Sequence, residues 1–212
     1  YKTPYISMLL ETPSSIAVQL LEMHTGSDLQ KASDMFEELT CRAVKGYLGE
    51  GSEAIIFGPN NLHRPVSFKD AIKWLAKQLR VAEGKERKPS TRKDGGVDVV
   101  GWKPHTDKRT GMTVLLIQST IGKDIFKKTA DIDLDLWKGW LKFRPDPTMA
   151  IATPCQIPFD DEWDEIGKRA MLFDRTRIAN LIDEENDSDV QNLYERNSKI
   201  IERLRKCLED LE

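Results

Sequence analysis

Two apolar segments near the middle of the chain, residues 97–102 and 112–118, constrain the fold more than any other feature. The second contains Val114 to Ile117 as a nearly continuous apolar run, which is typical of a strand covered on both faces. The turn-rich residues 104–111 between them predict a hairpin. With helical patterns before and after this hairpin, the sequence predicts an α/β fold.

The region before the hairpin is expected to be mainly helical. Residues 13–48 carry apolar side chains at three- and four-residue steps, with a break near Gly26, and Gly49 and Gly51 are expected to end the second of these helices. Ser67 is expected to cap a further amphipathic helix.

Shorter elements complete the expected core. Residues 54–57 and 149–152 are short apolar runs and are interpreted as strands. Residues 131–143 are expected to form a helix that places Trp137 and Trp140 in the core.

The last part of the chain is expected to be helical. One stripe is formed by Trp163, Ile166, Ala170, Met171 and Phe173. From Asp187 onward an apolar seam with one polar position consists of Val190, Tyr194, Asn197, Ile201, Leu204, Leu208 and Leu211, and a second stripe of Leu193, Ile200 and Cys207. The seam predicts a helix–helix contact within the chain, in a homodimer, or with a larger partner subunit.

Three regions follow from these patterns. Residues 1–29 are expected to be an N-terminal helical segment. Residues 30–158 are expected to form the core, with a helical insertion and a basic loop at about residues 67–94. Residues 159–212 are expected to form a C-terminal helical region.

Composition excludes several classes of protein. The 212 residues carry 32 basic and 35 acidic side chains, so the net charge of −3 favours no particular class of partner. The three cysteines are widely spaced, which favours ordinary thiols in a reducing cytoplasm, and the three histidines lack the spacing of zinc ligands. Neither a secretory signal nor an apolar stretch long enough to span a membrane is expected.

Polar residues on the predicted hairpin indicate a metal site. Asp98 begins the first strand after Asp94-Gly95-Gly96, whereas Gln118 and Thr120 end the second strand. Because side chains alternate along a strand, Asp98 and Gln118 are expected to lie side by side. With a carboxylate from a nearby helix, such oxygen-bearing groups suit Mg²⁺ or Mn²⁺.

These motifs resemble the PD-(D/E)xK nuclease superfamily, and within it the Mrr-like restriction endonucleases. The resemblance covers roughly residues 30–155 and implies a restriction-endonuclease-like α-β-β-β-α-β core. It also implies metal binding by Asp98, Gln118 and Glu37, or Glu38 in place of Glu37. The implied function is a Mg²⁺-dependent DNA endonuclease in restriction or anti-phage defence.

The chain departs from the family pattern at one position. Thr120 stands where the family has Lys, and Lys123 follows it within three residues as a candidate catalytic lysine. If Lys123 does not act in this way, the expected function is a nuclease-like module that binds DNA or a partner subunit, such as an ATPase or sensor, without cutting.

A basic loop precedes the predicted metal strand. Its candidate DNA-binding residues are Lys85, Arg87, Lys88, Arg92 and Lys93. Lysines and arginines in such a position bind the phosphate backbone and release counterions.

Each candidate residue also has a purely structural interpretation. Asp98 is then a turn cap, Gln118 a strand-end amide, Glu37 half of a solvated charged pair, and Lys123 a surface lysine. The basic loop is then solvated surface, and the chain a helical interaction protein with the sheet as scaffold.

Overall fold

A computed structural model describes residues 26–59, 61–89, 93–121, 125–182 and 188–209. The elements are α3 (Gly26–Leu48), β1 (Glu53–Ile56), α4 (Phe68–Leu79), β2 (Val99–Trp102), β3 (Val114–Ser119), α5 (Ile125–Lys128), α6 (Leu134–Trp140), β4 (Thr148–Ala152), α7 (Asp161–Gly167), β5 (Met171–Phe173), α8 (Arg175–Leu181) and α9 (Ser188–Glu209). The predicted α/β class is confirmed.

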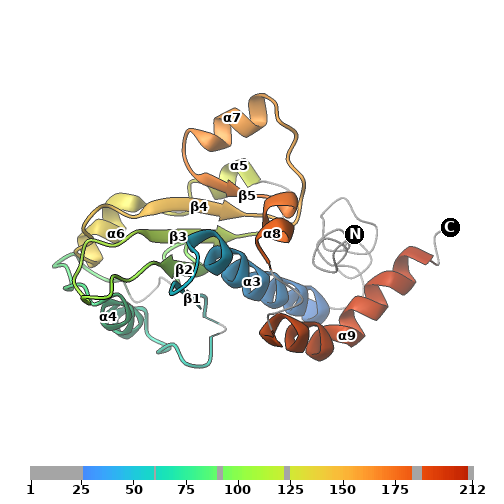
Figure 1. Ribbon diagram of the computed structural model, residues 1–212, viewed down its shortest axis with the longest axis horizontal. Coiled ribbons are helices and arrows are strands. Elements are labelled where there is room, and N and C mark those ends of the chain that lie inside the picture. The colour runs from blue at the N-terminus through green and yellow to red at the C-terminus, as the bar shows by residue number, and fades with distance from the viewer. Residues whose placement is uncertain (1–25, 60, 90–92, 122–124, 183–187, 210–212) are drawn as a thin grey trace.

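The strands form one mixed sheet in the order β1-β2-β3-β4-β5 (Figure 1). β1, β2 and β3 pair antiparallel, so the predicted hairpin is confirmed. β4 lies parallel to β3, and β5 lies parallel to β4. The parallel pairs need crossover connections, which contain α5 and α6 in one case and α7 in the other.

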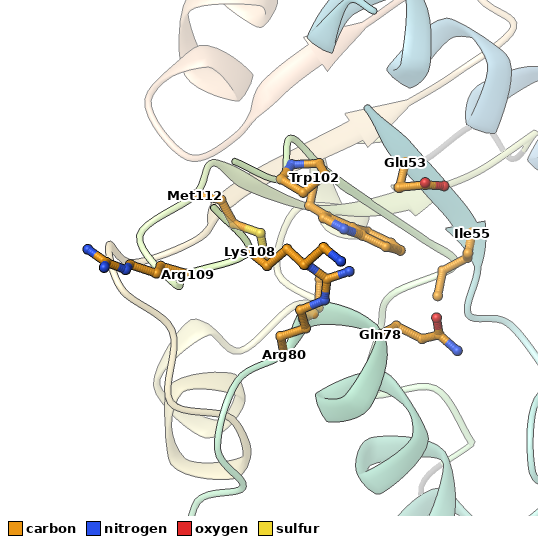
Figure 2. Close-up of a pocket in the computed structure, with 10 residues that line it drawn as sticks. Glu53, Ile55, Gln78, Arg80, Trp102, Lys108, Arg109 and Met112 are labelled. Atoms are coloured by element: carbon orange, nitrogen blue, oxygen red, sulfur yellow. The ribbon is translucent and has the colours of Figure 1, made fainter. Parts of the chain in front are cut away.

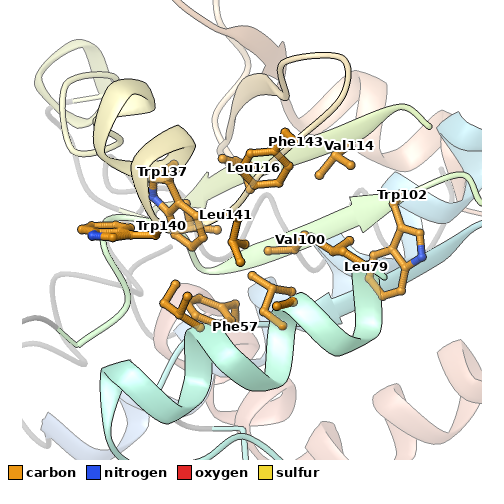
Figure 3. Packing of buried hydrophobic residues seen from close by; sticks show 14 of the residues in the cluster. Phe57, Leu79, Val100, Trp102, Val114, Leu116, Trp137, Trp140, Leu141 and Phe143 are labelled. Carbon is orange, nitrogen blue, oxygen red and sulfur yellow. The ribbon is translucent and has the colours of Figure 1, made fainter. Parts of the chain in front are cut away.

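Alternating side chains of β3 divide the core between the two faces of the sheet. Val114 and Leu116 pack with α4 and α6, where Trp137 and Trp140 are fully buried as predicted (Figure 3). Leu115 and Ile117 pack with α3 and α8 on the other face. Burial on both faces explains why β3 has a continuous apolar sequence rather than an alternating one.

Gly101 in β2 allows α3 to approach the sheet closely. A Cβ atom at this position would lie 2.2 Å from Cγ1 of Val44 in α3. Only glycine fits here without a shift of the Val44 side chain or of the helix, so the contact allows α3 to lie close to the strands that carry the candidate site.

The predicted helix ends are largely confirmed. Ser67 caps α4 by accepting a hydrogen bond from the backbone N–H of Asp70, and Asp133 caps α6 in the same way through Leu136. Gly49 and Gly51 follow α3 with φ angles of 79° and 75°. The helix expected between residue 13 and the break near residue 26 lies outside the described residues.

The helical stripe expected from Trp163 to Phe173 is wrong. α7 ends at Gly167, and Met171–Phe173 is strand β5, which hydrogen-bonds to β4. Leu172 and Phe173 face different apolar clusters on opposite sides of the sheet. A run this short has no periodicity that separates strand from helix, so pairing with β4 decides its structure.

The predicted contact of the C-terminal helix is present within the chain. α9 packs on α3, where Leu193 is buried, and Arg42 pairs with Asp189 at 2.7 Å. Arg196 pairs with Glu38 at 2.5 Å. The side chains of most seam positions lie outside the described residues. No helix in the described ranges has the length and apolar character needed to cross a membrane.

Candidate metal centre

The β2–β3 hairpin brings two predicted site residues into direct contact. Nε2 of Gln118 donates a hydrogen bond of 2.6 Å to Oδ2 of Asp98. The backbone N–H of Ser119 donates to the same oxygen at 2.8 Å. The expectation that Asp98 and Gln118 lie side by side is confirmed, and among the described residues no donor binds Oδ1.

The backbone of Asp98 is fixed as firmly as its side chain. Its N–H donates to the carbonyl of Ile117 at 2.9 Å, and its own carbonyl accepts from Phe57 at 2.6 Å and from Gly58 at 3.1 Å. Asp98 therefore joins β3 to the end of β1, and its position depends on both neighbours.

The two glycines before Asp98 make the turn that delivers it. Gly95 and Gly96 have φ angles of 68° and 79°, a region that glycine adopts readily. A Cβ at Gly96 would lie 2.1 Å from the carbonyl oxygen of Asp131. Oδ1 of Asp94 accepts from the N–H of Gly96 at 2.8 Å, so Asp94 stabilises the turn, whereas Asp98 does not cap it.

Glu37 in α3 completes the acidic group. The helix lies against the end of β3, where the hydroxyl groups of Thr40 and Ser119 are 3.4 Å apart. Glu37 is only 7% exposed, and its Oε2 is buried without a hydrogen-bond partner. Oε2 lies beside Gly58, where a Cβ would be 3.2 Å away. Glu38, the alternative ligand, instead pairs with Arg196 on α9.

The surroundings raise the pKa of both carboxyl groups. Burial raises the pKa of Glu37 to about 8, with further contributions from the negative charge of Asp98 and of other nearby acids. Burial also raises the pKa of Asp98 to about 6, against the hydrogen bond from Ser119, which lowers it. Ionisation of both carboxyl groups is therefore disfavoured, and a bound cation would offset this cost.

The position of the family's lysine is occupied by a buried threonine. Thr120 is 8% exposed, and its N–H donates to the carbonyl of Ala152 at 3.0 Å. Lys123 lies outside the described residues. The described cation that lowers the pKa of Asp98 is Lys128 of α5, which pairs with Asp131 at 2.9 Å.

The basic loop is only partly available for a ligand. Lys85, Arg87 and Lys93 are exposed, whereas Arg92 lies outside the described residues. Nζ of Lys88 donates to the carbonyl of Gly84 at 3.2 Å and lies 3.8 Å from Glu83. The carbonyl of Lys93 accepts a hydrogen bond from buried Arg64, which ties the end of the loop to the segment after β1.

Sequence reasoning missed three contributors to this site. They are the N–H of Ser119, the turn-stabilising Asp94 and the cation Lys128. No side-chain pattern marks a backbone donor, but the Lys127–Lys128 pair close after β3 is a visible signal.

The oxygen atoms of the three candidate ligands are of the type that binds a hard cation. Glu37 and Asp98 supply carboxylates and Gln118 an amide, while in the described part of the chain no cluster of three or more His, Cys, Asp or Glu residues suited to a metal occurs. Oxygen donors favour Mg²⁺ or Mn²⁺ over zinc. The orphaned, buried Oε2 of Glu37 fits such an ion, because a cation would neutralise the charge that burial disfavours.

Comparison of the chain with protein-family models, with curated proteins and with solved structures finds no match.

Proposed function

We propose that this chain is a Mg²⁺-dependent DNA endonuclease with a restriction-endonuclease-like core. The observation that carries the proposal is the buried pair of Glu37 and Asp98, with Oε2 of Glu37 unpartnered and Asp98 held by Gln118. Folding that buries an unpartnered carboxyl beside a second acid is unfavourable unless a ligand compensates, so the arrangement points to a bound cation.

The order and direction of the elements support the proposed core. A helix, α3, precedes three antiparallel strands, and after α6 strand β4 joins the sheet parallel to β3. Apart from α4, which is inserted between β1 and β2, and the short α5 before α6, this order resembles the α-β-β-β-α-β core that the family resemblance implies. Glu37 lies on the first helix, Asp98 directly before the second strand and Gln118 near the end of the third, which supports their proposed roles as ligands.

In the proposed reaction the chain's own residues position and tune the metal ligands. Glu37, Asp98 and Gln118 would hold Mg²⁺, which supplies an acidified water and stabilises charge that develops on the phosphate. The Ser119 N–H and the Gln118 amide orient Asp98 and leave Oδ1 without a described donor. Lys128, or Lys123 in the undescribed segment, would supply the positive charge that Thr120 lacks.

The exposed cations of the loop before β2 support DNA as the substrate. Lys85, Arg87 and Lys93 lead directly into the turn that delivers Asp98, so phosphates bound by them would lie near the metal centre. A role in restriction or anti-phage defence in the cytoplasm, together with a partner ATPase or sensor subunit, belongs to this proposal through the family resemblance alone.

A second candidate function is a nuclease-like module that binds DNA without cutting it. Two observations favour it: Thr120 is buried in place of the lysine, and Glu37, Asp98 and Gln118 are each only 7–9% exposed. Both limit the access and activation of an attacking water.

Plasmid cleavage separates the two functions. Wild-type protein is incubated with supercoiled DNA in Mg²⁺, in Mn²⁺ and in EDTA, beside Asp98→Asn and a matched surface control, Asp161→Asn, on the exposed first turn of α7. Metal-dependent nicking by the wild type and the control, but not by Asp98→Asn, supports the nuclease. A DNA mobility shift without nicking supports the binding module, and neither cleavage nor binding would reject both.

A further inference from the structure

A second polar site lies at the other end of β2 from Asp98. There Trp102 lines a cavity of about 210 Å³ between the hairpin, β1 and the end of α4. Its wall also includes Glu53, Gln78, Arg80, Lys108 and Met112. None of these residues belongs to the candidate metal centre, because Trp102 ends β2 whereas Asp98 directly precedes that strand.

Two cations converge in this cavity. Figure 2 shows the ends of Arg80 and Lys108 directed toward one another, whereas Arg109 points away from them. Within the described ranges neither side chain is held by an ion pair or a hydrogen bond, while Arg109 is 3.7 Å from Asp107. Both side chains are exposed, and two like charges on one cavity wall raise the local positive potential, which favours an anion there.

Arg80 and Lys108 share an unusual backbone conformation, which makes them convenient positions for substitution. Among the described residues, Arg80 and Lys108 are the only non-glycine residues with positive φ, at 55° and 60°. This conformation costs a bulky L-residue roughly 1–2 kcal/mol, and glycine or asparagine adopts it more easily. Arg80 adopts it as the left-handed C-cap of α4 and Lys108 in the turn that its N–H closes with the carbonyl of His105, and both residues line the same cavity.

The other residues that line the cavity indicate which chemical groups a ligand would carry. Glu53 and Gln78 lie across the cavity and offer acceptors for hydroxyl or amino groups, and Trp102 and Met112 form an apolar surface. Arginine and lysine together are suited to a phosphate group, which offers several acceptor oxygens and two charges. A ligand with a phosphate at one end and hydroxyl groups beside it matches both halves of the wall.

We propose that this cavity binds the phosphomonoester of a nucleotide, with Arg80 and Lys108 on the phosphate and Glu53 on a sugar hydroxyl. The same phosphomonoester is present in a free mononucleotide and at the 5′ end of a nucleic-acid strand. The proposal is independent of nuclease activity, because it uses none of the metal-centre residues.

Binding is measured by calorimetry with full-length protein in EDTA, so that no metal links a phosphate to Asp98. The probes are inorganic phosphate, a nucleoside monophosphate, the matching nucleoside, and one oligonucleotide with either a 5′-phosphate or a 5′-hydroxyl. The expected result is saturable binding of the monophosphate and none of the nucleoside. Tighter binding of the 5′-phosphorylated strand than of the 5′-hydroxyl strand would identify the strand end as the source, and equal binding would identify the free nucleotide.

The variant Arg80→Gly/Lys108→Gly tests the assigned residues without damaging the fold. Glycine relieves the positive-φ strain at both positions, so thermal stability is expected to be unchanged or higher. Affinity for the monophosphate is expected to fall at least about tenfold. Lys73→Gln, an exposed lysine on α4 outside the cavity, is the control and should bind as the wild type does. Absence of binding by the wild type, or undiminished binding by the stable double-glycine variant, would overturn the proposal.

Discussion

At the residue scale, the two acids of the candidate centre differ in how they are stabilised. Asp98 accepts two hydrogen bonds on one oxygen, whereas Glu37 is buried with Oε2 unpartnered. The hydrogen bonds fix the orientation of Asp98, and burial keeps Glu37 protonated near neutral pH in the absence of a cation. Substitutions at the two positions should therefore have different effects.

Asp98→Ala is expected to abolish metal-dependent cleavage and also to destabilise the fold. The substitution leaves the buried N–H of Ser119 without its acceptor, a loss of about 1–3 kcal/mol. Asp98→Asn keeps an acceptor and should retain most of the stability while cleavage falls about a hundredfold or more. Urea unfolding and plasmid cleavage of both variants provide the measurement. Wild-type cleavage by Asp98→Asn would remove Asp98 from the reaction.

Glu37→Gln is expected to change how stability depends on pH. The pKa of Glu37 is about 8 in the folded protein and 4.5 when unperturbed, so the folded state binds the proton more tightly. The stability that the folded state gains from a protonated, buried Glu37 is fully present below pH 4.5. It falls by up to about 1.4 kcal/mol per pH unit as the pH rises to about 8. Asp98 acts in the same direction between its ordinary pKa of 3.8 and about 6.

The measurement is urea unfolding at several pH values with and without Mg²⁺. Without metal, the wild type should lose stability between pH 5 and 8, and Glu37→Gln should lose less. Mg²⁺ should restore the stability of the wild type at pH 8 more than that of the variant. A flat wild-type profile would contradict the burial of an ionisable Glu37.

Sequence reasoning identified residues whose placement follows from strand geometry. Asp98 and Gln118 meet because the side chains of a hairpin alternate, and turn glycines precede one of them. The burial of Glu37 could not be predicted from the sequence, because Glu37 and Glu38 are adjacent acids. Tertiary packing buries Glu37, whereas Glu38 forms an ion pair with Arg196.

At the element scale, the segment between β1 and β2 joins a packed helix to a basic loop. α4 buries one face, including Phe68 and Leu79, against the sheet. The indole N–H of Trp140 donates to the carbonyl of Arg87 at 3.0 Å, so the loop after α4 is anchored at its middle. This hydrogen bond fixes the backbone at Arg87, whose exposed side chain is one of the candidate DNA-binding cations.

The triple variant Lys85→Gln/Arg87→Gln/Lys93→Gln is expected to weaken DNA binding and reduce its salt dependence. If all three bind phosphates, the slope of log K against log salt should fall by about 3 units, at about 0.9 per contact. Lys88→Gln is the comparison, and a smaller change is expected because Glu83 and Gly84 already engage that lysine. Titrations at several salt concentrations measure the slopes, and an unchanged slope in the triple variant would assign the loop to solvated surface.

Element types were predictable where a pattern was long enough. The hairpin, α4 and α6 followed from clear periods, and Ser67 was visible as the cap of α4, whereas the structure alone shows that Asp133 caps α6. β5 did not, because three residues after a helix carry no period of their own, and pairing with β4 determines their conformation.

At the scale of the whole molecule, α9 covers α3 with a contact that is partly apolar and partly ionic. Leu193 is buried, and Arg196 pairs with Glu38. Tyr194 of the predicted seam packs against the same cluster as Leu193, so both described apolar side chains of this pattern serve intramolecular packing. The proposed contact with a second copy therefore rests on the sequence pattern of the later seam positions.

A chain that ends at Glu185 is expected to be monomeric, whereas the full chain is expected to be a homodimer. A nuclease that cuts both strands of duplex DNA benefits from two active sites, one in each copy of a dimer. The seam on α9 is the proposed contact between the two copies. Light scattering of both proteins gives the masses. Arg196→Gln is the control, because it removes the ion pair with Glu38 but leaves the apolar residues, and it should keep the dimer mass. Equal monomer masses for the full and shortened chains would contradict the dimer.

The close contact of α3 with Gly101 lies far along the helix from Glu37, the candidate ligand that the same helix carries. Val44 rests on Gly101, and Glu37 lies seven residues earlier on the same helix face, about 10 Å along the axis. A methyl group added by Gly101→Ala would collide with the Val44 side chain, and any outward shift of α3 that relieves the collision would move Glu37 relative to Asp98. The absence of a side chain at Gly101 therefore helps to set the spacing of two acids that it does not touch.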